Sequence, residues 1–260
     1  MTIRKPEKKN TRRNWLVIIP FILVAIASIG YLWYKHVSIE QAKLIRYPAF
    51  GIDIPDRYEI HGIDVSKYQG FIDWPSVKEM RMNDVNIGFA FIKATEGLAD
   101  VDKQFKRNWE KAAEAGVTRG AYHFFIPTRS GKKQAKNFIK NVKLGPGDLP
   151  PVLDIEQMNR VKPDKMRKEV QDWLTVVEDF YKVKPIIYTY VSFYSSFMQG
   201  QFDDYPLWAA HYLEKDKPRI KREWLFWQYT ERGRVNGITR PVDFNVFNGD
   251  MADFQGLLVK

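Results

Sequence analysis

Residues 151–156 read Pro-Val-Leu-Asp-Ile-Glu, a short run that predicts a β-strand. Its leucine and isoleucine alternate with Asp154 and Glu156, and side chains alternate between the two faces of a β-strand. One face of the predicted strand is therefore apolar, and the other carries two carboxylates. Helical periodicity precedes this strand at 132–143 and follows it at 164–181, which predicts a β–α–β unit.

The same alternation of strands and helices extends in both directions from this unit. Strand-like segments are predicted at 60–66, 87–94, 118–124, 151–156, 186–191, 207–212, 224–230 and 242–247. Helical segments are predicted at 75–83, 102–115, 132–143, 164–181 and 193–198. Five strand–helix units followed by three strands predict an α/β fold, a (β/α) barrel of eight strands without its last helices and with parallel connections.

Composition and charge limit the classes of function. The chain has 260 residues, of which 45% are hydrophobic, so it can bury a core. It has no cysteine, which excludes disulfides, thiolate metal sites and a cysteine nucleophile. The formal net charge is +10, and half of this excess lies in residues 1–14. The remaining charge is mixed and follows no nucleic-acid-binding motif, so no nucleic-acid partner is expected.

The N-terminal region predicts export. Residues 15–34 form an apolar run without a charge, and twenty helical residues span roughly 30 Å, the thickness of a hydrocarbon core. We therefore expect a basic cytoplasmic tail at 1–14, a transmembrane helix or signal anchor at 15–34, a spacer at 35–59 and a folded domain at 60–260. Alternatively, Ala-Ile-Ala at 25–27 is a signal-peptidase site and the domain is secreted. Both alternatives place the domain outside the cytoplasm, on the periplasmic or extracellular side.

Carboxylates recur in other predicted strands. Asp64 lies in the first strand and Asp243 in the last. Because active sites of (β/α) barrels gather at the carboxyl ends of the strands, we expect these residues to meet Asp154 and Glu156 there. Neighbouring carboxylates push their pKa values apart, as acid–base catalysis at neutral pH requires. Each residue also has a structural interpretation: a lone aspartate often caps a turn, and His123 is by default a hydrogen-bonded core histidine.

Other common chemistries have no support in the sequence. The four histidines are scattered, and no HExxH, P-loop or GxSxG motif occurs. We therefore expect acid–base chemistry without a metal or another cofactor.

Six segments between residues 60 and 250 carry a resemblance to a known family. They are Asp64-Val65-Ser66 with Gln69 and Ile72-Asp73-Trp74, the run 91–97 (Phe-Ile-Lys-Ala-Thr-Glu-Gly), Gly120-Ala121-Tyr122-His123-Phe124, Asp154-Ile155-Glu156, Trp227-Gln228-Tyr229 and Asp243-Phe244-Asn245. In this order they resemble the glycoside hydrolase family 25 lysozymes, the Chalaropsis-type N-acetylmuramidases.

The resemblance implies a flattened (β/α)5β3 barrel at 60–260 that hydrolyses the β-1,4 bond between N-acetylmuramic acid and N-acetylglucosamine with retention. Glu156 would be the general acid, and Asp154 would orient the 2-acetamido group of the substrate, which itself attacks the anomeric carbon. A direct carboxylate nucleophile is the other route. Asp64 and Asp243 would complete the acidic floor of the cleft. The expected substrate-binding residues are Lys93, Tyr122, Tyr188, Trp227 and Gln228.

The expected partners are the glycan strands of peptidoglycan and, through the N-terminal helix, a membrane. Two rival classes remain open. The chain could be a membrane-tethered protein that binds peptidoglycan without turnover, or a tethered scaffold whose barrel serves only interaction. The complete acidic set favours the enzyme, because neither rival needs inward-facing carboxylates.

Overall fold

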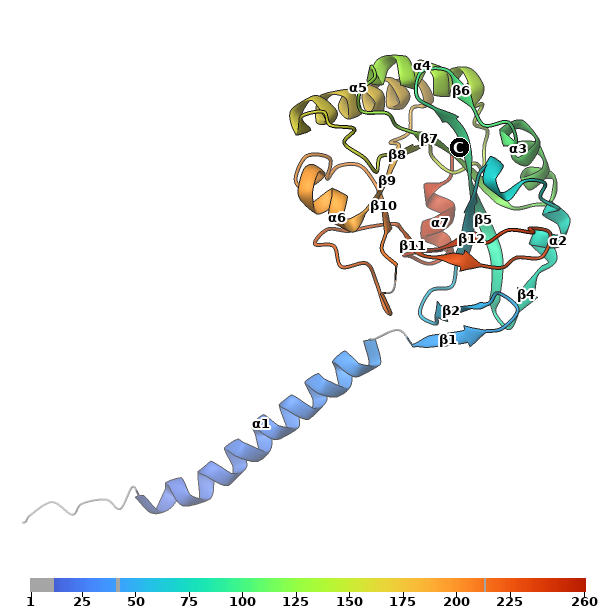
Figure 1. Ribbon diagram of the computed structural model, residues 1–260. Coiled ribbons are helices and arrows are strands. Elements are labelled where there is room, and N and C mark those ends of the chain that lie inside the picture. Colours follow the sequence, from blue (N-terminus) through green and yellow to red (C-terminus); the bar gives the residue numbers. More distant parts are fainter. Residues whose placement is uncertain (1–11, 41–42, 213) are drawn as a thin grey trace, which may run out of the picture. The chain divides into compact units, whose positions relative to one another are not determined.

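The computed structural model describes residues 12–40, 43–212 and 214–260, and in the first of these segments it describes side chains from 19 to 33 (Figure 1). The chain divides into two compact units, Met1–Ala42 and Lys43–Lys260. The predicted tail at 1–14 lies largely outside the described residues.

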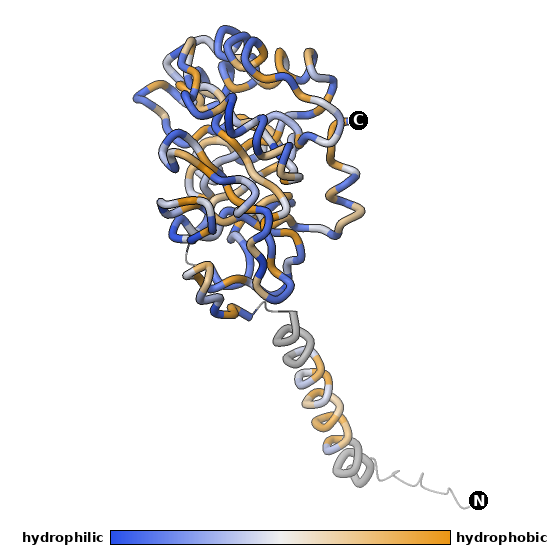
Figure 2. The backbone as a smooth tube through the Cα atoms, turned by 90° about the vertical axis from the view of Figure 1, so that its right-hand side faces the viewer, coloured by the Kyte–Doolittle hydropathy of each residue, from blue (hydrophilic) through white to orange (hydrophobic). Residues whose placement is uncertain are grey.

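The first unit contains one helix, α1 (Arg12–Glu40). The large apolar side chains described between Ile19 and Trp33 are exposed, and Figure 2 shows the apolar character of this stretch. Within the part of the chain that the structure describes, no helix combines the length and apolar character needed to cross a membrane. The predicted span at 15–34 begins and ends at residues whose side chains are not described.

The second unit is built on a closed ring of eight strands (Figure 1). In spatial order these are β3 (His61–Val65), β12 (Val242–Phe247), β11 (Phe226–Gly233), β10 (Leu207–Ala210), β9 (Ile186–Tyr190), β8 (Val152–Asp154), β7 (Thr118–Phe124) and β5 (Val85–Glu96). β5 pairs with β3 and closes the ring. The eight predicted strands and the barrel are confirmed.

The expectation of parallel connections is wrong at the last strand. β12 runs antiparallel to both of its neighbours, β11 and β3. A short loop without a helix joins β11 to β12, and a parallel crossover needs a much longer connection. β12 therefore starts at the end of the barrel where the other strands finish. This direction brings Asp243, near the start of β12, opposite Asp64 in the strand register.

Helices cover the outside of the ring at the predicted places. They are α2 (Trp74–Glu79), α3 (Phe105–Glu114), α4 (Gly131–Asn141), α5 (Pro163–Tyr181) and α6 (Val191–Phe193), which continues as a π-helical turn, η2 (Tyr194–Met198). Short elements at the ends of the strands are η1 (Lys67–Gln69), β4 (Arg81–Met82) and β6 (Asp100–Val101). A further helix, α7 (Met251–Leu257), was not expected from the sequence.

The predicted spacer at 35–59 is wrong over its second half. β1 (Leu44–Tyr47) and β2 (Ile52–Pro55) form an antiparallel hairpin. Tyr47, Phe50, Ile52 and Ile54 are buried in the main core, whereas Leu44 and Ile45 are exposed. The Phe50 ring meets Phe244 of β12 edge-on at 5.4 Å. Turn residues such as Gly51 interrupt a short apolar alternation here, so the sequence pattern resembles a linker.

The interior of the barrel is filled by aromatic rings. Phe89 and Phe91 of β5, Phe226 of β11 and Phe254 of α7 belong to one buried cluster, distinct from the core beneath the outer helices. Gly120 leaves room for them, because a Cβ atom at this position would lie 2.5 Å from the Phe91 ring. The interior of the barrel is therefore closely packed, and we call this cluster of rings the aromatic plug. The polar groups lie at one end of the barrel.

Candidate active site

The four predicted catalytic carboxylates lie in one cleft. The cleft has a volume of about 300 Å³, and Asp64, Asp154, Glu156 and Asp243 all line it. Asp154 is the last residue of β8, Glu156 follows two residues later, and Asp243 lies at the start of the antiparallel strand. The cleft opens at the carboxyl ends of the parallel strands, where the barrel fold predicts it.

Alternation along β8 separates the cleft from the core. Leu153 and Ile155 are fully buried in the core beneath the outer helices, whereas Asp154 points into the cleft and is 5% exposed. Glu156 is more exposed because the strand has already ended there. The predicted division of this segment into an apolar and an acidic face is confirmed.

Two amide side chains hold Asp64. Gln228 Nε2 and Asn245 Nδ2 each donate a hydrogen bond of 2.8 Å to Asp64 Oδ2. Gln228 Oε1 in turn accepts from the hydroxyls of Tyr188 (2.8 Å) and Tyr212 (2.7 Å). Two phenolic donors to Oε1 thus fix the orientation of the Gln228 amide.

Trp208 fixes the second amide. Its Nε1 donates to Asn245 Oδ1 at 2.8 Å. An indole nitrogen only donates, so Asn245 must present its carbonyl to Trp208 and its NH2 group to Asp64. The Trp208 ring stacks on Phe91 at 4.3 Å between ring centroids, which connects the acidic floor to the aromatic plug below it.

Burial raises the pKa values of both members of the facing pair, Asp64 and Asp243. Burial raises the pKa of Asp64 to about 6, against the opposing effect of its two amide donors. Burial, followed by the charge of Asp64, raises the pKa of Asp243 to about 9. The pair therefore favours a bound proton, because two neighbouring carboxylates resist ionising together.

The second pair, Asp154 and Glu156, also favours a bound proton. Burial, and then the adjacent Glu156 charge, raise the pKa of Asp154 well above its usual range. Burial also raises the pKa of Glu156, although Asp154 and Lys93 oppose the rise. Asp154 Oδ1 is buried and has no hydrogen-bond partner among the described residues. An unpaired buried carboxylate oxygen is costly unless a ligand completes it.

Four of the five expected substrate-binding residues line the cleft, namely Lys93, Tyr122, Tyr188 and Gln228. Lys93 Nζ forms an ion pair of 2.7 Å with Glu96 and lies 4.6 Å from the centre of the Phe124 ring.

Trp227 does not line the cleft. Its side chain is fully buried in the outer core, and its Nε1 donates to the His211 carbonyl oxygen at 3.0 Å. Adjacent strand residues face opposite sides, so Gln228 points inward and Trp227 outward. We therefore leave Trp227 out of the site. His123 is a buried, hydrogen-bonded residue of the same outer core, with its Nδ1 2.7 Å from Thr95 Oγ1.

The cleft also contains residues that were not predicted as part of the site. They are Ser66, Phe124, Trp208, Tyr212 and Glu231. Tyr212 and Glu231 stand beside predicted strand ends, which is the available sequence signal for them. Trp208 carried no signal, because an aromatic residue in a strand is by default a core residue.

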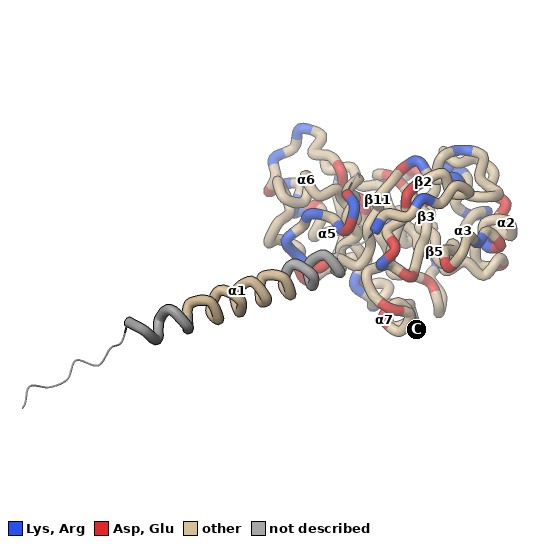
Figure 3. The backbone as a smooth tube through the Cα atoms, turned by 90° about the horizontal axis from the view of Figure 1, so that it is seen from below, with Lys and Arg blue, Asp and Glu red and all other residues tan. Residues whose placement is uncertain are grey.

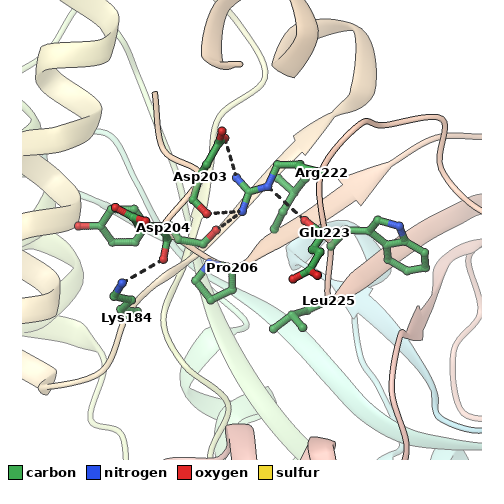
Figure 4. Close-up of a pocket in the computed structure, with 10 residues that line it drawn as sticks. Lys184, Asp203, Asp204, Pro206, Arg222, Glu223 and Leu225 are labelled. Carbon is green, nitrogen blue, oxygen red and sulfur yellow. Dashed lines mark hydrogen bonds and ion pairs between the residues drawn. The ribbon is translucent and has the colours of Figure 1, made fainter. Parts of the chain in front are cut away.

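A second hollow lies at the start of β10 and β11, the opposite end of these strands from the carboxylates. It measures about 400 Å³. Figure 4 shows Arg222 donating to Asp203 and to the carbonyl oxygen of Glu223, and Lys184 donating to the carbonyl oxygen of Asp204. Lys184 and Arg222 connect neighbouring loops through these hydrogen bonds. We therefore assign the residues around this hollow a structural role.

A barrel with paired carboxylates at its strand ends is the arrangement of a glycoside hydrolase. Residues 63–238 match the family model described as Glycosyl hydrolases family 25. The chain belongs to this family and is a glycoside hydrolase.

Relatives agree with this assignment. The chain is 47% identical over 210 residues to the uncharacterized protein YegX of Escherichia coli O6:H1 (strain CFT073), covering 81% of this chain and 77% of YegX. It is 37% identical to Lysozyme M1 of Streptomyces globisporus, over 76% of this chain and 70% of that protein. A family 25 glycosyl hydrolase from Bacillus anthracis has a similar structure, with a TM-score of 0.69, 37% identity and coverage of 78% and 95%.

Proposed function

We propose that this protein is a muramidase of the Chalaropsis type, which hydrolyses the β-1,4 bond between N-acetylmuramic acid and N-acetylglucosamine in peptidoglycan. The observation that carries the proposal is the pair of carboxylates Asp154 and Glu156 in the cleft of a family 25 chain. The likeness to Lysozyme M1 supports this substrate class. Basic and acidic residues are interspersed over the barrel unit (Figure 3), so a nucleic-acid surface has no support.

Glu156 acts as the general acid. It delivers its proton to the glycosidic oxygen while the bond from that oxygen to the anomeric carbon breaks. In the free protein, Asp154 and Glu156 share a raised proton affinity. A substrate N–H that donates to the unpaired Asp154 Oδ1 would stabilise ionised Asp154 and leave the proton on Glu156.

The substrate's 2-acetamido group supplies the nucleophile. Its carbonyl oxygen bonds to the anomeric carbon as the leaving group departs, and Asp154 accepts the hydrogen bond of the acetamido N–H. Water then attacks the anomeric carbon, the bond from this carbon to the acetamido oxygen breaks, and the water gives a proton to Glu156, which now acts as a base. The configuration is therefore retained. Lys93, Tyr122, Tyr188 and Gln228 position the sugar.

Retention has a direct test. Proton NMR of the first-formed product is expected to show the β-anomer before mutarotation. A direct carboxylate nucleophile would give the same anomer, whereas the α-anomer as first product would exclude both routes.

The catalytic proposal is tested with purified peptidoglycan. Wild-type protein is expected to release soluble fragments, and Glu156→Gln, which keeps the shape but holds no transferable proton, is expected to release almost none. Glu110→Gln, an exposed change on α3, is the matched control and is expected to behave as wild type. Tight sedimentation of wild-type protein with peptidoglycan, without release, would favour the binding protein without turnover.

We also propose that residues 15–34 anchor the protein in a membrane, with the barrel on the periplasmic or extracellular side. The support is the uncharged apolar run behind a basic tail and its helical backbone in α1. The full-length chain should then fractionate with membranes and resist extraction at high salt. A mature chain that begins near Ser28 and is recovered from the soluble exported fraction would instead support signal cleavage.

A further inference from the structure

Two exposed aromatic side chains lie close in the chain to a residue of the cleft. Tyr68 and Phe71 are 60% and 68% exposed. They follow Ser66, which lines the cleft, on the segment that leaves the carboxyl end of β3. Single exposed aromatics are ordinary. Two of them on one short segment beside a carbohydrate-cleaving cleft call for a further reason.

Each ring is backed by a guanidinium group. Arg240 lies 4.9 Å from the centre of the Tyr68 ring, and Arg107 lies 3.8 Å from the centre of the Phe71 ring. Arg107 is itself fixed, because its Nη1 donates to the carbonyl oxygen of Ile72 at 2.9 Å. A cation against one side of an aromatic ring holds the ring in place, and the high exposure shows that much of each ring is still accessible.

The segment that carries the rings is tied down on two sides. The Lys67 amide donates to Asp102 Oδ2 at 2.8 Å, ahead of α3. Gln69 Nε2 donates to the carbonyl oxygen of Pro241 at 3.2 Å, just before β12. Gln69 also closes a capping box with Ser66. The two rings are therefore held on a preorganised edge of the cleft, so a ligand that meets them does not need to order the loop.

We propose that Tyr68 and Phe71, which we call the rim pair, bind sugar rings of the glycan strand beyond those held in the carboxylate cleft. A pyranose ring offers an apolar face of C–H groups, which packs on an accessible aromatic face, and its hydroxyls stay in water. The cleft, at about 300 Å³, is small for a long polymer. The rim pair thus makes the enzyme prefer long strands to short ones. This inference rests on the proposed function.

The test compares two peptide-free oligosaccharides of alternating N-acetylglucosamine and N-acetylmuramic acid, a tetrasaccharide and an octasaccharide. The readout is the kcat/KM for the octasaccharide divided by that for the tetrasaccharide. We expect Tyr68→Ala and Phe71→Ala each to lower this ratio about two- to tenfold, the size of one lost aromatic contact. Tyr68→Phe keeps the ring and should keep the ratio. Phe180→Ala removes a comparably exposed aromatic on α5 and should also keep it.

Equal effects of the alanine variants on both lengths, or no effect, would overturn the inference. An effect seen only with peptide-bearing strands would also overturn it, since the occupant would then be the peptide. Binding of the same oligosaccharides to Glu156→Gln protein, measured by calorimetry, separates this inference from the proposed function. If wild-type protein cleaves neither oligosaccharide, the proposed function fails, and the calorimetric length preference alone decides whether the rim pair binds sugars.

Discussion

At the scale of single residues, the chemistry depends on side chains that orient other side chains. Asp64 can accept two amide hydrogens only if both amides face it, and Trp208 enforces this for Asn245. Tyr188 and Tyr212 do the same for Gln228. The position of the Asp64 carboxylate is thus set by the groups that orient its two amide donors.

The first prediction concerns this positioning. Trp208→Phe removes the indole N–H and leaves Asn245 Oδ1 without its donor, so the amide no longer has a fixed orientation. We expect kcat on soluble peptidoglycan fragments to fall about tenfold, equivalent to roughly 1.4 kcal/mol, with a smaller change in KM. Trp227→Phe is the matched control, because the Trp227 N–H bonds a carbonyl outside the cleft. An unchanged kcat in the first variant would refute the positioning role.

The second prediction concerns pH and stability. The pKa of Asp243 is near 9 in the folded protein and about 4 for an ordinary aspartate, so the folded state binds more protons between these values. The contribution of Asp243 to the free energy of unfolding therefore falls as the pH rises from 4 to 9. Asp243→Asn removes this pH dependence. The Tm of the variant minus the Tm of the wild-type protein should therefore increase from pH 4.5 to pH 8.5. A difference in Tm that stays constant with pH would contradict this.

The sequence predicts the position of a single residue where that position depends on a local pattern, such as alternation along a strand. The alternation in 152–156 places Asp154 in the cleft and Leu153 in the core, and two-residue periodicity is visible in any strand. The same rule shows why Trp227 and Gln228 could not both contact substrate, since neighbours on a strand face opposite ways. Trp208 was not predicted, because the pattern of its strand does not show which face turns inward, and that depends on the barrel as a whole.

At the scale of elements, the sequence predicts where strands and helices lie better than how they connect. Apolar periodicity located all eight barrel strands and the long α5 helix. The direction of β12 depends on a loop too short for a crossover, and the β1–β2 hairpin depends on burial against the barrel. The first depends on the length of a connection and the second on tertiary contacts, and apolar periodicity encodes neither.

The third prediction tests the aromatic plug. In Gly120→Ala, the new Cβ atom would lie 2.5 Å from the Phe91 ring and 3.1 Å from Leu149, in a closed barrel that has little room to relax. We expect a loss of about 1–3 kcal/mol in the free energy of unfolding in urea. Gly256→Ala on α7 meets no atom within 4 Å and serves as the control. Equal stability of the two variants would show that the plug adapts.

At the scale of the whole molecule, the chain is a helix and a barrel unit with the hairpin included in the latter. The boundary falls at residue 43, and the fourth prediction follows from it. A chain beginning at Lys43 should unfold at the same urea concentration as the barrel unit of the full-length protein. A chain beginning at His61 loses Phe50, Ile52 and Ile54 from the core, at about 1.5–3 kcal/mol for each side chain. Equal midpoints would mean that the hairpin is only a linker.

The proposed function requires that the cleft cleaves peptidoglycan after N-acetylmuramic acid with Glu156 as the proton donor. The most direct test is the identity of the new reducing end. Peptidoglycan digested with the full-length protein is reduced with borodeuteride, hydrolysed and analysed by mass spectrometry. We predict deuterated muramitol with wild-type protein and almost none with Glu156→Gln. Deuterated glucosaminitol, or equal labelling with the variant, would contradict the claim.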